Sequence, residues 1–443
     1  MILVLIGYII LLYSLINYKK AFMYFLVYQI FWYYNASLFS IGGKTLTAST
    51  GFTLAFFVLY FFKHEKYVYP KERIPFFLPL VLICLSAFAT CFTSLAGFSS
   101  ELTRCLSTRI CPNVLVIWLA WQLIETEADY RWLFKAVTIT MFVACVFGLL
   151  EYATKSNLLF DMKSALASAG ISNYNTKSNL DATMRGYRLM SLFEHPVGAG
   201  MTFGLYFAFA ASVFVKERNK VPNSKVVLIT ALMCLACVVL TKMRSAIVFA
   251  VIASVSFVNF KKKKFYKIVI LIVLGLFAAW PLLSNQIGLI LSIFNSNYQA
   301  SVGGSSLEMR LSQFEAVFRV MSLSPVAGLG ESFKNYINNS ITLGTLGYES
   351  IWFEQMVQHG MIGVIANIIL MVYSIVIIPV RYRSKELFYI SLAYWVTTTL
   401  TGSEILFRIH LYYLAMFFYI KSSDIYQNQK TLIKRPIRFT LGR

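Results

Sequence analysis

Long apolar segments dominate the chain, and its polar residues are gathered in shorter stretches between them. About 20 consecutive apolar residues are enough for an α-helix to cross the hydrocarbon core of a bilayer. We therefore expect an all-α, polytopic membrane protein with about 12–13 transmembrane helices. The predicted spans lie at residues 2–18, 21–40, 46–62, 75–96, 112–124, 132–150, 188–215, 225–241, 244–260, 265–283, 351–379, 386–402 and 404–420.

The amino-acid composition agrees with a membrane location. Of the 443 residues, 58% are hydrophobic and only 13% are charged, which leaves too few charged side chains to cover the surface of a soluble chain of this length. Lysine and arginine number 40 against 19 aspartates and glutamates, so the formal net charge is +21. In membrane proteins such an excess lies mainly in cytoplasmic loops. We therefore expect the lipid bilayer, and no nucleic acid, as a partner.

The basic clusters predict which face is cytoplasmic. When the predicted spans alternate across the bilayer, one face receives all the clusters, at residues 19–20, 63–73, 216–220, 261–264, 381–385 and 430–443. The opposite, non-cytoplasmic face receives the larger loops, at 97–111, 151–187 and 284–350, and the tight turn at 241–244. We expect one integral domain over residues 1–443, with residues 284–350 as its longest loop.

An amphipathic helix is predicted inside this longest loop. Its apolar positions recur at helical spacing, at Leu307, Leu311, Phe314, Phe318 and Met321. The opposite side of the same helix is polar, with Glu308, Ser312, Glu315 and Arg319. Such a helix is expected to lie at the membrane surface. The following SPVAGLG, at 324–330, should end it, because proline cannot continue the helical hydrogen-bond ladder and glycine permits turns.

Basic residues on the predicted non-cytoplasmic face need an explanation other than orientation, because the positive-inside rule would place them on the other side. They are Arg185, Arg188, Lys242, Arg244, Arg310, Arg319 and Arg408, and we single out Arg188, Arg244 and Arg310. The planar guanidinium makes bidentate, charge-assisted hydrogen bonds to phosphate oxygens, so we expect a lipid-linked anionic substrate at this face. For Arg244 an equal alternative is that the side chain extends to the interface. Arg310 lies beside the apolar stripe, whereas Arg319 is expected to face solvent.

Three further residues are candidate bases. Glu349 follows a glycine-rich stretch where the long loop re-enters the membrane, although an exposed interfacial acid is the alternative. His195 and His359 stand next to a proline and a glycine, where histidines are more often structural. The sequence lacks a phosphate-binding P-loop, an HExxH or GxSxG motif and an acidic pair suited to a nucleotide sugar. We therefore expect neither a metal site nor a cofactor.

Four of these segments together resemble a known family. They are RLMSLFEHPVGAG at 188–200, TKMRSA at 241–246, MRLSQFEAVFRVMSLSPVAGLG at 309–330 and ESIWFEQMVQHGMIG at 349–363. In order and spacing they are similar to motifs of the O-antigen ligase and polymerase superfamily of bacterial inner-membrane glycosyltransferases. The resemblance implies a location in the inner membrane, an active site that faces the periplasm, and transfer of a glycan from undecaprenyl pyrophosphate by a metal-independent, inverting reaction.

The resemblance also implies roles for individual residues. Arg188, Arg244 and Arg310 would bind the pyrophosphate, and Arg310 would also be catalytic. The ligase branch carries a histidine about 11 residues before the first glycine of its re-entry segment. Counting back from Gly360 reaches Glu349 instead. We therefore favour a polymerase in which Glu349 activates the acceptor hydroxyl, with His195 as the second candidate.

The expected partners follow from this reading. They are oligosaccharides linked to undecaprenyl pyrophosphate, and also a chain-length regulator and a flippase for the lipid-linked repeat. Two other functions remain open. A ligase would transfer the finished glycan to lipid A core or another acceptor, and a transporter for lipid-linked sugar would carry internal repeats, which the sequence does not show.

Overall fold

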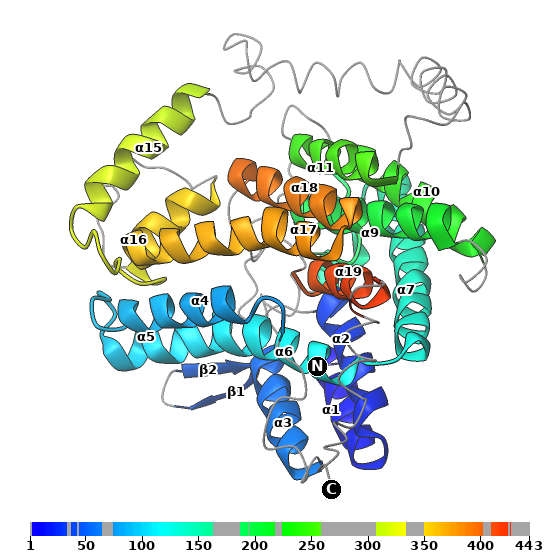
Figure 1. Ribbon diagram of the computed structural model, residues 1–443, viewed down its shortest axis with the longest axis horizontal. Helices are drawn as coiled ribbons and strands as arrows, with labels where there is room; N and C mark the ends of the chain where they lie inside the picture. Colours follow the sequence, from blue (N-terminus) through cyan, green and yellow to red (C-terminus); the bar gives the residue numbers. More distant parts are fainter. Residues whose placement is uncertain are drawn as a thin grey trace, which may run out of the picture.

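The computed structural model describes residues 2–32, 37–41, 44–63, 74–162, 187–193, 195–217, 224–257, 307–333, 350–401, 409–423 and 426. Within these ranges the regular elements are helices and one short β-hairpin (Figure 1). The elements of the first half are α1 (Ile2–Ile16), α2 (Tyr18–Trp32), β1 (Ser37–Ile41), β2 (Lys44–Thr47), α3 (Ala48–Lys63), α4 (Phe77–Thr90), α5 (Phe98–Cys105), the π-helix η1 (Leu106–Leu115), α6 (Val116–Leu123) and α7 (Glu127–Thr154). Those of the second half are α9 (Pro196–Glu217), α10 (Ser224–Leu240), α11 (Arg244–Ser254), the short η3 (Val255–Phe257), α15 (Leu307–Met321), α16 (Ile351–Val372), the π-helix η6 (Tyr373–Ile377), α17 (Ile378–Tyr382), α18 (Lys385–Thr401) and α19 (Ile409–Ser422).

The helices are those of a polytopic membrane protein, as the sequence predicts. In the described part of the chain, three are long and apolar enough to cross a membrane, at Glu127–Thr154, Pro196–Val215 and Ile351–Tyr382. Five more apolar helices are shorter. The fold class is thus confirmed, whereas the number of spans and the single domain over 1–443 remain predictions. The predicted span 265–283 and most of the loop 284–350 lie outside the described residues.

Several predicted spans have the wrong bounds. The span predicted at 112–124 is the last part of a helical run from Phe98 to Leu123, through α5, η1 and α6, so most of the predicted loop 97–111 is helical. The span predicted at 21–40 ends at Trp32, and β1 pairs with β2 in an antiparallel hairpin further along the chain. The span predicted at 188–215 begins only at Pro196, and the preceding residues 187–193 are irregular. Proline is suited to the first turn of a helix, where its missing N–H has no intrahelical partner. The segment that carries Arg188 is therefore a loop.

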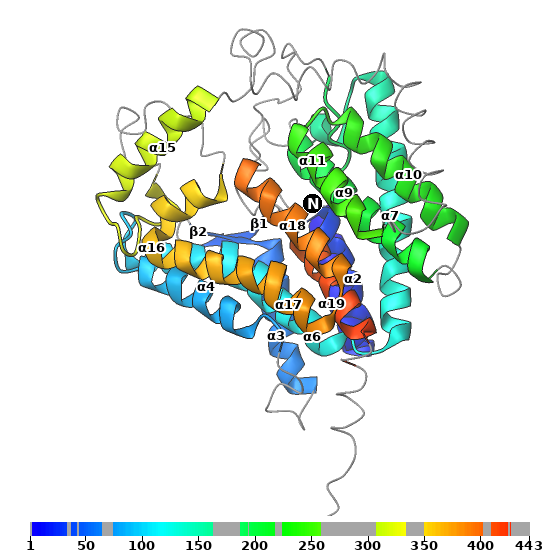
Figure 2. The same ribbon diagram turned by 45° about the horizontal axis from the view of Figure 1, so that its top comes forward.

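The helices form two groups that meet along α16 and α18. In one group α9 packs against both α10 and α11, and α11 also packs along α18. In the other, α4 lies along α16, and α15 flanks α16 on its outer side (Figures 1 and 2). Large aromatic side chains fill the interior of the first group, where Phe203, Tyr206 and Phe249 are fully buried. This packing fixes the ends of α9, α11 and α18, from which the candidate site is built.

The loop helix α15 lies where the sequence predicts it, at residues 307–321. Its apolar stripe is exposed, with Leu311 at 58%, Phe314 at 42% and Phe318 at 49% of full exposure. A second apolar face, which carries Val317 and Val320, is buried against α16. The exposed stripe fits a helix that lies on a membrane surface.

Candidate functional site

A buried carboxylate shapes the loop that carries Arg188. One oxygen of Glu151, at the end of α7, accepts hydrogen bonds from the Tyr187 hydroxyl at 2.9 Å and from the Met190 N–H at 3.0 Å. The other oxygen accepts the Ser191 N–H at 2.5 Å. Ser191 itself adopts a left-handed conformation with φ of 56°. Glu151 therefore satisfies two consecutive backbone N–H groups at a tight bend, which no local sequence signal predicts.

This loop packs against the turn between α10 and α11. The Leu189 N–H donates to the Leu240 carbonyl at 3.2 Å. A Cβ added to Gly200 in α9 would lie 2.6 Å from the Ala246 Cβ and 2.9 Å from the Thr241 hydroxyl, so only glycine allows this approach. The segments 188–200 and 241–246, which the sequence sets apart by about 50 residues, are thus in direct contact.

Positive charge gathers at this contact. Burial lowers the pKa of Arg188 from its ordinary value. Burial also lowers the pKa of Lys242, and the nearby charges of Lys155 and Arg188 lower it further. Lys155 and Lys242 both stand at helix ends in left-handed conformations, with φ of 52° and 54°. Arg244, half-buried, is the first residue of α11. A concentration of cations of this kind favours binding of a polyanion.

His195 lies beside the same cluster but has a structural contact. Its Nδ1 accepts the Val197 N–H at 3.1 Å, in the first turn of α9. Burial and the charge of Arg188 lower the pKa of His195 to about 4, so the imidazole is neutral at physiological pH. A first-turn N–H has no intrahelical acceptor, and His195 supplies one. The role of His195 as a base stays a prediction, and Nδ1 serves the helix end.

Removing the Glu151 carboxylate should destabilise the loop that carries Arg188, because Glu151 holds the backbone of that loop. We expect Glu151→Ala to lower the free energy of unfolding, because each buried N–H left without an acceptor costs about 1–3 kcal/mol. Thermal unfolding in detergent measures this change. The matched control is Glu127→Ala on the same helix, where an exposed ion pair with Arg131 is lost and the expected cost is below about 0.5 kcal/mol. Equal melting temperatures for the two variants would contradict the role of Glu151.

Arg310 is held at the end of α18. Its Nη2 donates to the Leu400 carbonyl at 2.7 Å. Carbonyls in the last turn of a helix have no intrahelical donor, so the contact suits both groups. Because α18 packs along α11, this bond ties the loop helix to the helix that begins with Arg244. Arg319 is exposed on α15, as expected. The structure thus joins Arg188 and Arg244 through packed segments, and places Arg310 on a neighbouring helix end.

The end of the long loop docks on a break in α16. Gly360 has non-helical angles, with φ of 59° and ψ of −158°. The backbone of the loop forms hydrogen bonds with α16 on both sides of this break. Before the break, the Leu329 and Gly330 N–H groups donate to the Val357 and Gln358 carbonyls at 2.9 and 3.0 Å. After it, the Met361 and Ile362 N–H groups donate to the Pro325 and Val326 carbonyls at 2.9 and 3.1 Å. A Cβ on Gly328 would lie 2.4 Å from the Gln358 carbonyl oxygen. The glycines of the two motifs therefore serve close backbone contact.

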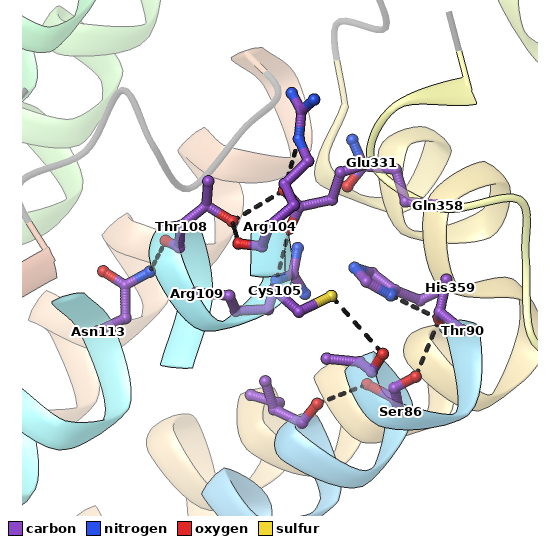
Figure 3. A network of polar contacts seen from close by, with 12 residues as sticks. Ser86, Thr90, Arg104, Cys105, Thr108, Arg109, Asn113, Glu331, Gln358 and His359 are labelled. Carbon is purple, nitrogen blue, oxygen red and sulfur yellow. Dashed lines mark hydrogen bonds and ion pairs between the residues drawn. The ribbon is translucent and has the colours of Figure 1, made fainter. Parts of the chain in front are cut away.

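Sequence reasoning missed an ion-pair network next to this docking point (Figure 3). Glu331 lies between Arg104 of α5 and Arg109 of η1, with nitrogen–oxygen distances of 3.4 and 3.5 Å. Glu101 accepts the Glu331 N–H at 2.8 Å. Topology offered a signal, because the predicted loop 97–111 shares its face with the loop 284–350. On that ground the sequence indicates Arg104 and Arg109 as further candidate binding residues.

The predicted catalytic acid Glu349 lies outside the described residues. The next residue, Ser350, caps α16, since its hydroxyl accepts the Trp352 N–H at 3.3 Å. The main chain thus enters α16 directly after Glu349.

Fold and site together define a multi-spanning helical membrane protein with cationic loop ends packed at one end of its helices. Residues 229–368 match the sequence model of a family described as O-antigen ligase. This match confirms the resemblance of the segment to the O-antigen ligase and polymerase superfamily, whose members are glycosyltransferase-like enzymes. Three of the four motif segments, 241–246, 309–330 and 349–363, lie inside the matched range. A comparison with curated proteins found no match.

Proposed function

We propose that the protein polymerises oligosaccharide repeat units carried on undecaprenyl pyrophosphate. The repeat units would belong to an O-antigen, a capsule or an exopolysaccharide. The reaction takes place at the periplasmic face of the bacterial inner membrane, where the growing glycan is transferred to the non-reducing end of another lipid-linked repeat. The observation that carries this proposal is the family match over 229–368, which includes Arg244, Arg310 and the start of α16.

The reaction needs positioning and charge stabilisation more than it needs a strong base. The acceptor hydroxyl oxygen attacks the anomeric carbon of the donor glycan, and the bond from that carbon to the pyrophosphate oxygen breaks. The pyrophosphate leaves with the bonding electrons, the hydroxyl proton passes to Glu349, and the configuration at the anomeric carbon inverts. Negative charge develops on the leaving group, where guanidinium groups stabilise it most.

Support for the donor site comes from the packed loop ends. The segment 187–193 and the turn 241–243 bring the charges of Arg188 and Lys242 close together, with Arg244 next in the chain. Cations at one end of a helical bundle suit a pyrophosphate at the membrane surface, with its lipid tail among the helices. Arg310 lies on a helix with an exposed apolar stripe, which supports a position at the membrane surface.

The second candidate is ligation of the finished glycan to another acceptor, as the description of the matched family suggests. A ligase shares the donor and the leaving group with a polymerase, and differs in the molecule that attacks. The favouring observation for the polymerase is Glu349, which stands where the ligase pattern has histidine.

Deleting the gene and separating the surface glycan on a gel tests the choice. We expect the ladder of polymer lengths to disappear while a single repeat unit remains attached to its final acceptor, because addition of further repeats has stopped. If all repeats are lost from the surface and polymer accumulates on the lipid carrier, the protein is a ligase. An unchanged ladder would exclude both activities.

A further inference from the structure

One acidic side chain lies between two arginines on the face assigned to the site. Glu331 follows directly on Gly330 at the end of the docked loop, and its carboxylate contacts Arg104 and Arg109. The side chains of Arg109 and Glu331 are only 11% and 9% exposed, whereas that of Arg104 is 45% exposed. The pair formed by Arg109 and Glu331 is therefore largely shielded from water.

The geometry of these ion pairs is far from the best that arginine can make. The Glu331 carboxylate meets the Nε of Arg104 at 3.4 Å and the Nε of Arg109 at 3.5 Å. Charge-assisted hydrogen bonds between such groups are typically about 2.7–2.9 Å long, and arginine binds oxyanions best through two parallel bonds. The Nη1 of Arg109 donates instead to the Gln355 amide oxygen at 3.3 Å. The short bond to the Glu331 carboxylate comes from the Thr108 hydroxyl, which donates to it at 2.8 Å. The carboxylate thus occupies this place without making short bonds to Arg109.

The side of α16 that faces Arg109 is polar and incompletely paired. The Thr90 hydroxyl donates its single hydrogen to backbone carbonyls, those of Ser86 and Ala327. In the tautomer that carries its hydrogen on Nδ1, His359 donates to this hydroxyl at 2.8 Å, and Nε2 then has a lone pair. This Nε2 is fully buried and has no hydrogen-bond partner in the described part of the chain. The imidazole ring is directed toward Arg109 (Figure 3).

The Glu331 carboxylate can leave while the loop stays docked. The Glu331 N–H is held by Glu101 at 2.8 Å, and the preceding Leu329 N–H is held by Val357. A Cβ on Gly330 would lie 2.6 Å from a Glu101 oxygen, so this glycine lets Glu101 approach the backbone. Because the main chain is fixed by these contacts, a change of the Glu331 rotamer, with loss of the bond from the Thr108 hydroxyl, would take the carboxylate away from the Nε of Arg109.

We propose that Arg109 is a further ligand for the pyrophosphate of the lipid-linked substrate, and that Glu331 occupies its place until the substrate displaces it. The proposal rests on the function proposed above, since it assumes a pyrophosphate-linked donor. A pyrophosphate carries more negative charge than one carboxylate and can use the forked edge of the guanidinium. The buried Glu331 then acts as an internal competitor, and the Gln355 and His359 side chains line the polar side of the site.

Binding of farnesyl pyrophosphate, a short lipid pyrophosphate, to the purified full-length protein in detergent tests this proposal. We expect Glu331→Gln to lower the dissociation constant by about tenfold, because the competing charge is gone while the side-chain shape is kept. Arg109→Ala should raise the dissociation constant at least about tenfold, and Arg109→Lys should raise it less, because lysine keeps the charge and loses the fork.

The control variant is Glu127→Gln, which removes an acid from an exposed pair with Arg131 elsewhere on the protein and should leave the dissociation constant unchanged. Farnesol, which lacks the pyrophosphate, should bind all variants equally. If Glu331 is only a structural clamp, Glu331→Gln will melt at a lower temperature and bind no more tightly, which overturns the inference.

The same titration separates failure of the inference from failure of the proposed function. If Arg188→Ala weakens binding while Glu331→Gln and Arg109→Ala behave like the wild type, the donor chemistry stands and Arg109 is no ligand. If the wild type binds farnesyl pyrophosphate no better than farnesol, both proposals are wrong.

Discussion

Arg310→Ala and Arg244→Ala should each abolish the polymer ladder while the protein still inserts in the membrane. In the proposed reaction, both guanidinium groups meet negative charge that develops as the pyrophosphate departs. Loss of one preorganised donor at such a position typically costs a factor of about 10²–10³ in rate, or about 3–4 kcal/mol. A reduction of this size should remove visible polymer. The measurement is the glycan ladder in a deletion strain that carries each variant, with membrane protein quantified by immunoblot.

Arg319→Ala is the matched control for Arg310→Ala, because both residues are on α15 and Arg319 is exposed. It should give a normal ladder. Arg310→Ala also breaks the hydrogen bond to the Leu400 carbonyl. Arg310→Lys keeps the positive charge and loses the planar guanidinium, so it shows which of the two the reaction needs. Normal ladders from both Arg310→Ala and Arg244→Ala would show that these arginines do not bind the pyrophosphate.

Gly328→Ala should detach the long loop from α16. The new Cβ would lie 2.4 Å from the Gln358 carbonyl oxygen, and Gly328 has a left-handed φ of 76°. The left-handed conformation costs a non-glycine residue about 1–2 kcal/mol, and overpacking against a fixed backbone typically adds about 1–3 kcal/mol. We expect a clearly lower melting temperature in detergent and loss of the ladder, because the loop also carries Arg310.

Gly97→Ala separates the two causes. Gly97 also has a positive φ of 80°, with ψ of 155°, but a Cβ there would have no atom within 4 Å. Gly97→Ala should therefore show a conformational cost of about 1–3 kcal/mol without a steric clash, with a lower melting temperature and a normal ladder. If Gly328→Ala also gives a normal ladder, close approach of the loop to α16 does not matter.

Apolar periodicity and length were sufficient to predict the loop helix and the longest apolar helices. The helix α15 was expected from apolar residues at helical spacing, and the structure places it at Leu307–Met321. Apolar length alone gave the approximate position of α7 and α16. It failed before α9, because Leu189, Met190, Leu192 and Phe193 extend the apolar pattern of the span toward the N-terminus, while Glu151 holds the backbone there in an irregular loop. A buried carboxylate on another helix leaves no trace in local hydrophobicity.

The contacts within the candidate site were less predictable for a similar reason. Motif order suggested that Arg188 and Arg244 belong together, and the contact of their segments agrees. Glu331 accepts a hydrogen bond from the hydroxyl of Thr108 in η1, which lies 223 positions earlier in the chain. A single sequence shows charge and predicts topology, so it can assign these residues to one face of the membrane. It does not show which residues of two distant loops are in contact.

The break at Gly360 divides α16 into two parts. Residues 361–382, which follow the break, are 22 in number and would extend about 33 Å as a helix, enough to cross the hydrocarbon core by themselves. The turns before the break, with the docked loop around them, would then stand at headgroup depth. A lipid-linked substrate could keep its tail in the bilayer and its sugars in water while the phosphates between them reach Arg109. The position of the kink would thus set the depth at which the bond between the sugar and the pyrophosphate is cleaved, at the level of the membrane surface.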